Sequence, residues 1–260
     1  MSAALSSRLL RGLVLPVLLI ALWQIAVNQI AQPTHAPFPW RVVLAAVGLI
    51  ASGDLPMAII QSLGRVFGGF FCAAAIAVPL GLTMGMWRPV ERNLDPIVES
   101  FRPVAAIAIL PLAILWFGTG TPAAVFIVAY AAFFPMVINT VAGVKRVDHR
   151  LVQAALTMGV GRLAILRTVI VPGALPSIGV GLRLGLGIAW TAIVAAELAV
   201  GAKAGGGGSG GIGQMMFVFY AYSVELNSIV VCMIAVGLVA LALDRLLRWL
   251  LRASMPWTTP

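Results

Sequence analysis

The sequence has little charge, little histidine and almost no cysteine. Only 10% of its 260 residues are charged, and it holds eight Asp and Glu together, two His and two Cys. Soluble domains carry roughly 25% charged residues, so this chain cannot cover a water-exposed surface with polar groups. The shortage of His, Cys and acidic residues also argues against a metal site and against a membrane-embedded enzyme, which would need such groups clustered within its spans.

Two motifs that would mark catalysis are also absent. No Gly-x-x-x-x-Gly-Lys-Ser/Thr run occurs in the sequence, so the chain has no P-loop with which to hold ATP itself. No Ser/His/Asp set or carboxylate pair is spaced for catalysis. Cys72 and Cys232 both fall inside apolar stretches, where thiols serve as small hydrophobic groups. We therefore expect a chain that is not an enzyme and binds no cofactor.

The sequence is instead rich in apolar residues, at 61% with a mean hydropathy of +1.05. It also carries a net charge of +9, which in a soluble protein suggests nucleic-acid binding. Here the basic residues lie in short loops between apolar stretches, and no basic stripe is interleaved with aromatics. The composition therefore indicates an integral membrane protein in contact with lipid and excludes a nucleic-acid partner.

We predict an all-α membrane protein with one transmembrane domain of about six helices, because the apolar runs can cross ~30 Å of hydrocarbon. The first run could pass for a secretory signal, but no small-residue cleavage site follows it. Between the spans we expect an external loop with an interfacial helix at 42–50, a polar loop at 87–101 and a flexible glycine-rich loop at 205–213. The expected spans are 9–30, 63–86, 103–117, 123–144, 174–200 and 226–250.

The positions of the basic residues predict the orientation of these spans. With both termini inside, thirteen Lys and Arg fall in inside segments, against Arg41 and Lys203 outside, while Arg65 and Arg183 lie within spans. Such an excess favours the cytoplasmic side, so we expect a multi-pass protein of the bacterial inner membrane with both termini cytoplasmic. The inside residues are Arg8, Arg11, Arg88, Arg92, Arg102, Lys145, Arg146, Arg150, Arg162, Arg167, Arg245, Arg248 and Arg252.

The basic loop at 145–172 carries the clearest motif. From 150 to 166, polar and apolar residues alternate at helical spacing, which predicts an amphipathic helix on the membrane surface. Ala154 and Ala155 would let a partner approach its backbone, Gly159 permits a turn, and Pro172 marks the start of the next span. An ordinary interfacial helix is the alternative.

The run from Gln153 through Ala154, Ala155 and Gly159 to Pro172 resembles the EAA loop of ABC importer permeases, although the family usually has Glu where Gln153 stands. Residues 102–120, 181–197 and the closing 256–257 are similar to permeases for nitrate, sulfonate, taurine and bicarbonate. The resemblance implies a type I importer permease in which this loop is a coupling helix. It also implies a separate ATPase that holds ATP and Mg, a solute-binding protein and a second permease copy, with this chain carrying no nucleotide.

Two charges in the fifth span suggest a path through the membrane. Arg183 and Glu197 are ~21 Å apart along a helix but within ~40° around it, and such a stripe avoids lipid. We expect this face, with Trp190, to line the path, and the resemblance places Pro111, Trp116 and Phe117 opposite. The alternatives are that Arg183 snorkels or ties helices together, and that Glu197 faces water or forms a gate or dimer contact. Arg65, near the outer end of span 2, is expected to snorkel.

Glycine pairs four residues apart suggest close helix crossings. They are Gly64 with Gly68, Gly81 with Gly85, and Gly181 with Gly185. The rival function is an ATP-independent secondary transporter or channel. A secondary transporter would predict inverted repeats, and the sequence has no paired halves. Nothing in this chain identifies the solute.

Overall fold

The computed structural model describes residues 18–19, 21–29, 37–203 and 210–255, and all the regular structure in these ranges is helical. Most of the expected first span lies outside the described residues, apart from helical residues at 18–19 and 21–29. Four long apolar helices could cross a membrane. They are α3 (Asp54–Met86), α6 (Thr121–Arg146), the run from α8 (Arg162–Ile165) into α9 (Val171–Lys203), and α11 (Leu226–Ser254).

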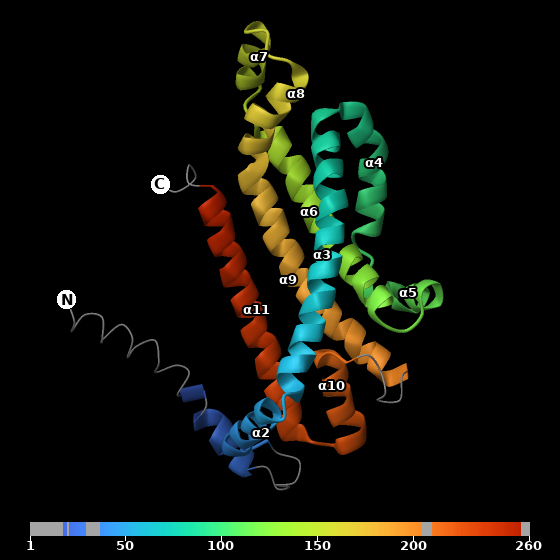
Figure 1. The fold of residues 1–260 in the computed structure, drawn as a ribbon, viewed down its shortest axis with the longest axis vertical. Coiled ribbons are helices and arrows are strands. Elements are labelled where there is room, and N and C mark those ends of the chain that lie inside the picture. The colour runs from blue at the N-terminus through green and yellow to red at the C-terminus, as the bar shows by residue number, and fades with distance from the viewer. Residues whose placement is uncertain (1–17, 20, 30–36, 204–209, 256–260) are drawn as a thin grey trace, which may run out of the picture.

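The remaining helices are short. α2 (Pro39–Ala51), α4 (Arg88–Phe101) and α5 (Leu110–Phe117) come before α6, and α7 (His149–Thr157) and α10 (Ile212–Val218) come after it. Figure 1 shows α3, α6 and α9 running side by side, with α11 next to α9. α7 and α8 form one end of the molecule, which we call the tip, while α2 and α10 lie at the opposite, distal end.

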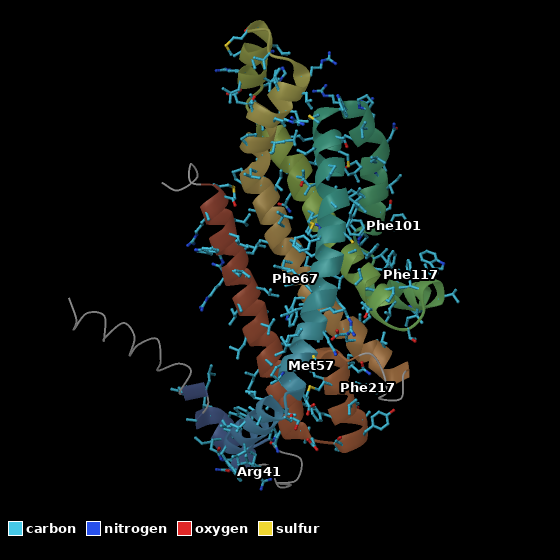
Figure 2. The ribbon with its side chains drawn as sticks, viewed as in Figure 1. Arg41, Met57, Phe67, Phe101, Phe117 and Phe217 are labelled. Carbon is cyan, nitrogen blue, oxygen red and sulfur yellow. The ribbon has the colours of Figure 1, made fainter. Side chains whose placement is uncertain are left out.

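The expected third span, 103–117, is corrected by the structure. α5 has eight residues, which rise only ~12 Å, so it cannot cross a bilayer by itself. The expected polar loop at 87–101 is instead α4, an amphipathic helix with Val98 buried and Val90 and Leu94 packed on the core. α4 and the stretch Ala106–Phe117 are bent by 86°, which is the geometry of a broken span or of a re-entrant loop. α4 lies along the bundle, and the following stretch with Phe117 projects from it (Figure 2). We call α4 and this stretch the limb.

A stripe of small residues on α3 lets its backbone approach α6. Its members repeat every fourth residue, so they share one helix face. A Cβ on Gly81 would lie 2.6 Å from Thr140 Cβ and 3.0 Å from a backbone oxygen of α6, whereas Gly64 meets nothing within 4 Å. Of the expected Gly64/Gly68 pair, Gly64 therefore lies off the contact, whereas a Cβ on Gly68 would be 3.6 Å from Val125 of α6. The stripe consists of Gly69, Ala73, Ala77, Gly81 and Gly85.

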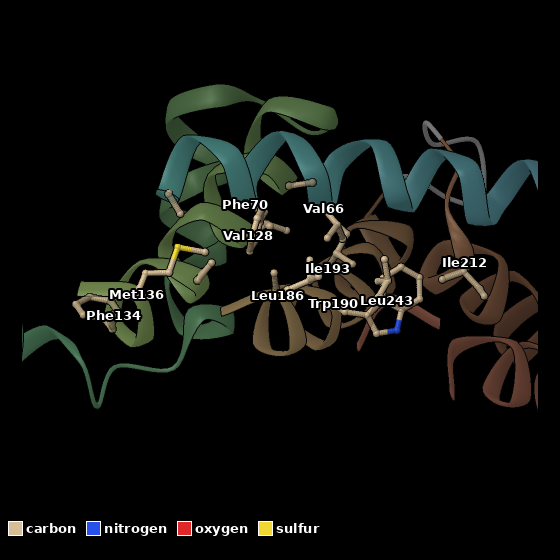
Figure 3. Packing of buried hydrophobic residues seen from close by; sticks show 14 of the residues in the cluster. Val66, Phe70, Val128, Phe134, Met136, Leu186, Trp190, Ile193, Ile212 and Leu243 are labelled. Atoms are coloured by element: carbon tan, nitrogen blue, oxygen red, sulfur yellow. The ribbon is translucent and has the colours of Figure 1, made fainter. Parts of the chain in front are cut away.

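α9 approaches the other side of α6 in the same way. A Cβ on Gly181 would lie 3.1 Å from the Pro135 oxygen, and one on Gly185 would lie 3.2 Å from the Ala132 oxygen. The core then fills with larger side chains, and those labelled in Figure 3 come from α3, α6, α9, α10 and α11. α6 is thus the central helix, with α3 and α9 held close on either side. Labelled core residues are Val66, Phe70, Val128, Phe134, Met136, Leu186, Trp190, Ile193, Ile212 and Leu243.

Candidate functional site

The tip is built by two capped helix ends. At the start of α7, the Asp148 carboxylate accepts a hydrogen bond from Arg150 N at 2.9 Å, which satisfies a free helix donor. At its end, Gly159 adopts a left-handed backbone with φ of 76°, as helix-terminating glycines do. The chain then turns into α8, so the expected helix over 150–166 is two short helices joined by a turn.

The surface of the tip is apolar and exposed. Leu151, Leu156, Met158 and Leu163 are 58%, 51%, 74% and 62% exposed. Leu156 and Leu163 also line a cavity behind the tip, whereas Leu151 and Met158 are not part of that lining. Exposed large apolar groups of this kind mark an interaction site.

The motif residues at the tip divide between two roles. Gln153 and Ala154 are also exposed, whereas Ala155 is buried. Ala155 therefore supports the fold of the tip, while its neighbours are available to a partner.

A cavity of about 900 Å³ lies behind the tip. It is bounded by the α3–α4 turn, the end of α6, and the inner sides of α7 and α8, including Trp87, Arg162 and Leu166. An ion pair between Glu91 of α4 and Lys145 of α6 lies at its wall. The tip is thus separated from the α3–α4 end by open space and is tethered mainly through its connections to α6 and α9.

Pro172 lies in the first turn of α9, directly after the π-helical turn Leu166–Ile170. Proline has no N–H and its ring crowds the carbonyl four residues earlier. A widened π turn at this point lets the helix continue past that carbonyl. The structure therefore makes the stretch from Arg162 through α9 nearly continuous, where we expected Pro172 to mark a fresh start.

A buried polar network lies in the distal half of the bundle. Arg65 Nη1 of α3 is 2.6 Å from Glu197 Oε1 of α9, and the two side chains are only 6% and 2% exposed. Ser62 Oγ donates to the same carboxylate, at 2.7 Å from Oε2. Arg65 does not snorkel, and Glu197 faces neither water nor a path: each is held inside the subunit by the other.

The network also holds the backbone at the start of α10. Arg65 Nη1 donates to the Gly210 oxygen at 2.7 Å. Ile212 N donates to Ser62 Oγ at 2.9 Å, and Gly213 N donates to Glu197 Oε2 at 3.1 Å. Sequence reasoning missed α10, because its seven residues follow a glycine run that predicts only a loop.

The other expected path residues divide between core and surface. Trp190 is 1% exposed, and its indole N–H donates to the Val236 oxygen of α11 at 3.1 Å, so it ties α9 to α11 inside the subunit. Arg183 is 43% exposed and pairs with Asp244 of α11 at 2.5 Å, while Arg248 pairs with the same carboxylate. The predicted stripe of Arg183, Trp190 and Glu197 thus faces other helices of the same chain.

The limb residues expected on the opposite wall are on the surface. Trp116 and Phe117 are 61% and 48% exposed, and both rings contact Phe126 of α6. Pro111, in the first turn of α5, is also exposed. The inner face of α5 packs on the part of α9 nearest the distal end. The limb therefore lies beside the distal end of α9, and its cluster does not include Trp190 or Glu197.

A comparison with known protein families shows which family this chain belongs to. The profile described as "Binding-protein-dependent transport system inner membrane component" matches residues 77–256. The chain belongs to this family. It is therefore a multi-pass inner-membrane permease of an ABC importer, and it is a transport subunit, not an enzyme.

Individual permeases resemble the chain over most of its length. An ABC transporter permease protein of Methanocaldococcus jannaschii is 38% identical over 94% of this chain and 90% of its own. The taurine transport system permease protein TauC of Escherichia coli is 36% identical over 94% and 87%. The bicarbonate transport system permease protein CmpB of Synechococcus elongatus is 35% identical over 74% and 67%. These relatives confirm the predicted resemblance to the taurine and bicarbonate group.

A solved permease structure shares the fold. A chain from inward-facing MetNI, a methionine ABC transporter, has a TM-score of 0.62 at 19% identity, covering 76% of this chain and 95% of that one. At this identity the likeness concerns the fold alone. It confirms the predicted class, an all-α permease like those of type I importers.

Proposed function

We propose that this permease couples ATP hydrolysis on a separate ATPase subunit to the import of a small anion. The observation that carries the proposal is the exposed apolar tip, which extends beyond the apolar spans at one end of the molecule (Figure 1). Leaving Leu151 and Met158 in water would be unfavourable, and a docked ATPase would cover them. In this proposal α7 is the coupling helix, and ATP and Mg are bound by the partner.

The proposed orientation places the tip in the cytoplasm. The basic residues Arg150 and Arg162 of the tip, and Arg146 at the adjoining end of α6, agree with the positive-inside rule. Both termini are then cytoplasmic, and the distal end meets a solute-binding protein outside.

A second copy of the permease would pair along α9. An exposed stripe on this helix contains Val180, Leu184 and Ile188 together with the small Gly187 and Thr191. Small residues of this kind favour helix contacts in membranes. We propose that the path for solute lies between the two copies and that lipid surrounds the remaining apolar faces.

The proposed solute is a small anion such as taurine, another sulfonate, nitrate or bicarbonate. Support comes from relatives named for taurine and bicarbonate transport, which share an anionic group. Within this chain, the partly exposed Arg183 is the proposed attractor, and the α5 limb with Trp116 and Phe117 is the proposed wall near the outer end. ATP-independent transport is the outcome that would contradict the proposal.

The docking step can be tested with two matched variants. Met158→Asp puts a charge on the most exposed apolar residue of the tip, and Tyr220→Asp does the same to a 72% exposed residue at the distal end. Central interface residues contribute ~2 kcal/mol or more, so Met158→Asp should weaken ATPase binding by roughly thirtyfold, as measured by co-purification and titration.

The result for the control decides the interpretation. Tyr220→Asp should retain the ATPase, and both variants should insert into the membrane at normal levels. If Met158→Asp retains full ATPase binding and ATP-dependent uptake in vesicles, the tip is not the docking site. Ala155 is a poor target for this test, because it is buried and its replacement would unfold the tip.

A further inference from the structure

The segment at 210–218 returns into the bundle after α9 has left it. Ser62 and Arg65 lie eight and eleven positions after Asp54, the first residue of α3, which places them ~12–17 Å along that helix. The backbone of Gly210, Ile212 and Gly213 is hydrogen-bonded at this depth. α10 then runs back toward the distal end (Figure 1), so the segment is re-entrant.

A re-entrant backbone has polar groups that its own helix cannot satisfy. The first N–H groups of a helix have no partner within it, and inside a membrane no water replaces that partner. Here Ser62 and Glu197 accept from the first two N–H groups of α10, which has no side-chain cap of its own. The carboxylate also lies at the positive end of the helix dipole. The cap of α10 is therefore supplied by α3 and α9.

The glycines of the segment fit it to the network. Gly210 and Gly211 have φ of 75° and 117°. Residues other than glycine rarely adopt such positive values of this backbone angle. A Cβ on Gly211 would overlap the Glu197 carboxylate, and one on Gly213 would lie 2.8 Å from Glu197 Cβ. Gly211 and Gly213 are thus required by their close approach to Glu197, whereas a Cβ on Gly210 would overlap the Gln61 side chain.

We propose that Ser62, Arg65 and Glu197 are positioning residues that hold the re-entrant segment 210–218 as a fixed outer cover of the subunit throughout the transport cycle. Opening the network would leave two buried ions and three backbone groups without partners in a low-dielectric interior, where such groups are costly. α3, α9 and α10 therefore move as one body at this end. The outer opening of the path must come from other elements, such as the α4–α5 limb.

A thiol-labelling experiment tests this proposal in the assembled transporter. Ile212 is fully buried directly after Gly211, and Tyr220 is exposed two residues beyond the segment, in the π-helical turn Phe219–Ser223. Ile212→Cys and Tyr220→Cys are placed in a background with Cys72 and Cys232 replaced by Ala, and the permease is assembled with its ATPase and binding protein in nanodiscs. A polar maleimide is then applied without nucleotide and after trapping with ATP and vanadate.

The expected result is protection in both states. Ile212→Cys should react at least about a hundredfold more slowly than Tyr220→Cys, since labelling requires local opening. Adding Glu197→Gln should speed labelling of Ile212→Cys at least about tenfold. A control substitution, Gly64→Ala, one residue from Arg65 and without neighbours within 4 Å, should leave labelling unchanged.

Three outcomes would overturn the proposal. Rapid labelling of Ile212→Cys only in the trapped state would make the segment a moving gate. Rapid labelling in both states would show that it is not held, and continued protection with Glu197→Gln would show that the network does not hold it. If Glu197→Gln does not assemble, Ser62→Ala removes the acceptor for Ile212 N and gives the same comparison.

The test separates a positioning role from general destabilisation and from failure of the proposed function. A merely structural role would lower the yield of complex and leave the ratio of solute imported to ATP hydrolysed unchanged, whereas loosening a cover should lower that ratio. The proposed role of the segment as a cover rests on the proposed transport function. The labelling measured without nucleotide does not depend on that function. Protection without any ATP-dependent uptake would refute the transport function and leave the fixed segment standing.

Discussion

Replacing Gly81 by alanine should destabilise the permease, although alanine is the better helix former. Gly81 lies inside α3, and its added Cβ would be 2.6 Å from Thr140 Cβ and 3.0 Å from the Val137 oxygen of α6. The second of these atoms belongs to a helix backbone and cannot rotate away. The change therefore forces α3 and α6 apart along the small-residue stripe.

The magnitude follows from two opposing terms. Gly→Ala inside a helix gains ~0.8–1.0 kcal/mol from helix propensity, while overpacking a close contact costs ~1–3 kcal/mol and at times more. Gly81→Ala should therefore lose up to ~2 kcal/mol. Gly64→Ala, on the same helix with no atom within 4 Å, should show only the gain. The two variants should differ by ~1–3 kcal/mol.

Thermal unfolding of the purified permease in detergent measures this difference. At ~2–4 °C per kcal/mol for a protein of this size, the midpoint of Gly81→Ala should lie several degrees below that of Gly64→Ala. Gly69→Ala, whose Cβ would lie 2.7 Å from the Val125 oxygen, should behave like Gly81→Ala. Equal midpoints for Gly81→Ala and Gly64→Ala would refute the direct backbone contact between α3 and α6.

Three further changes probe α9 and the orientation. Trp190→Phe should lower the free energy of unfolding by ~1–3 kcal/mol, because it removes the 3.1 Å hydrogen bond to α11; an unchanged melting midpoint would contradict this. Arg183→Gln should lower anion uptake in vesicles yet cost at most ~1 kcal/mol of stability, because its ion pair with Asp244 is 43% exposed on the arginine side; normal uptake would remove it from the path. With native cysteines replaced, a cysteine at Tyr220 should react with an impermeant reagent from outside the cell and one at Met158 only from inside, and the reverse pattern would invert the proposed topology.

The sequence predicts the long spans because their apolar runs are continuous and bounded by polar residues. α6 and α11 occupy Thr121–Arg146 and Leu226–Ser254, where the runs 123–144 and 226–250 were expected. The third span was mispredicted for a physical reason. The charged residues of 88–99 lower the mean hydropathy of α4. Hydropathy averaged along the sequence therefore predicts a polar loop here, although the segment is an amphipathic helix that packs on the core.

The partners of buried charges could not be read from the sequence. Glu197 and Arg65 are 132 positions apart, and only the packing of α3 against α9 brings them together. Helical geometry alone places Glu197 on the same side of α9 as Arg183, and that is compatible with a stripe facing solute or with two separate ion pairs inside the subunit. Small-residue spacing was likewise informative about Gly81 and Gly85 but not about Gly64, which has the same spacing without a neighbour.

The continuity of the helix that leaves the tip makes it a lever. From Arg162 to Val200 it runs for 39 residues, or ~58 Å, with the tip at one end and Glu197 near the other. Its middle packs closely on α6 at Gly181 and Gly185, where a Cβ would meet both side-chain and backbone atoms of α6, so α6 acts as its fulcrum. A small displacement at the tip would then produce an opposite displacement beside the α5 limb. The π turn before Pro172 and the interior Pro176 are places where this helix lacks regular α-helical hydrogen bonding and can bend.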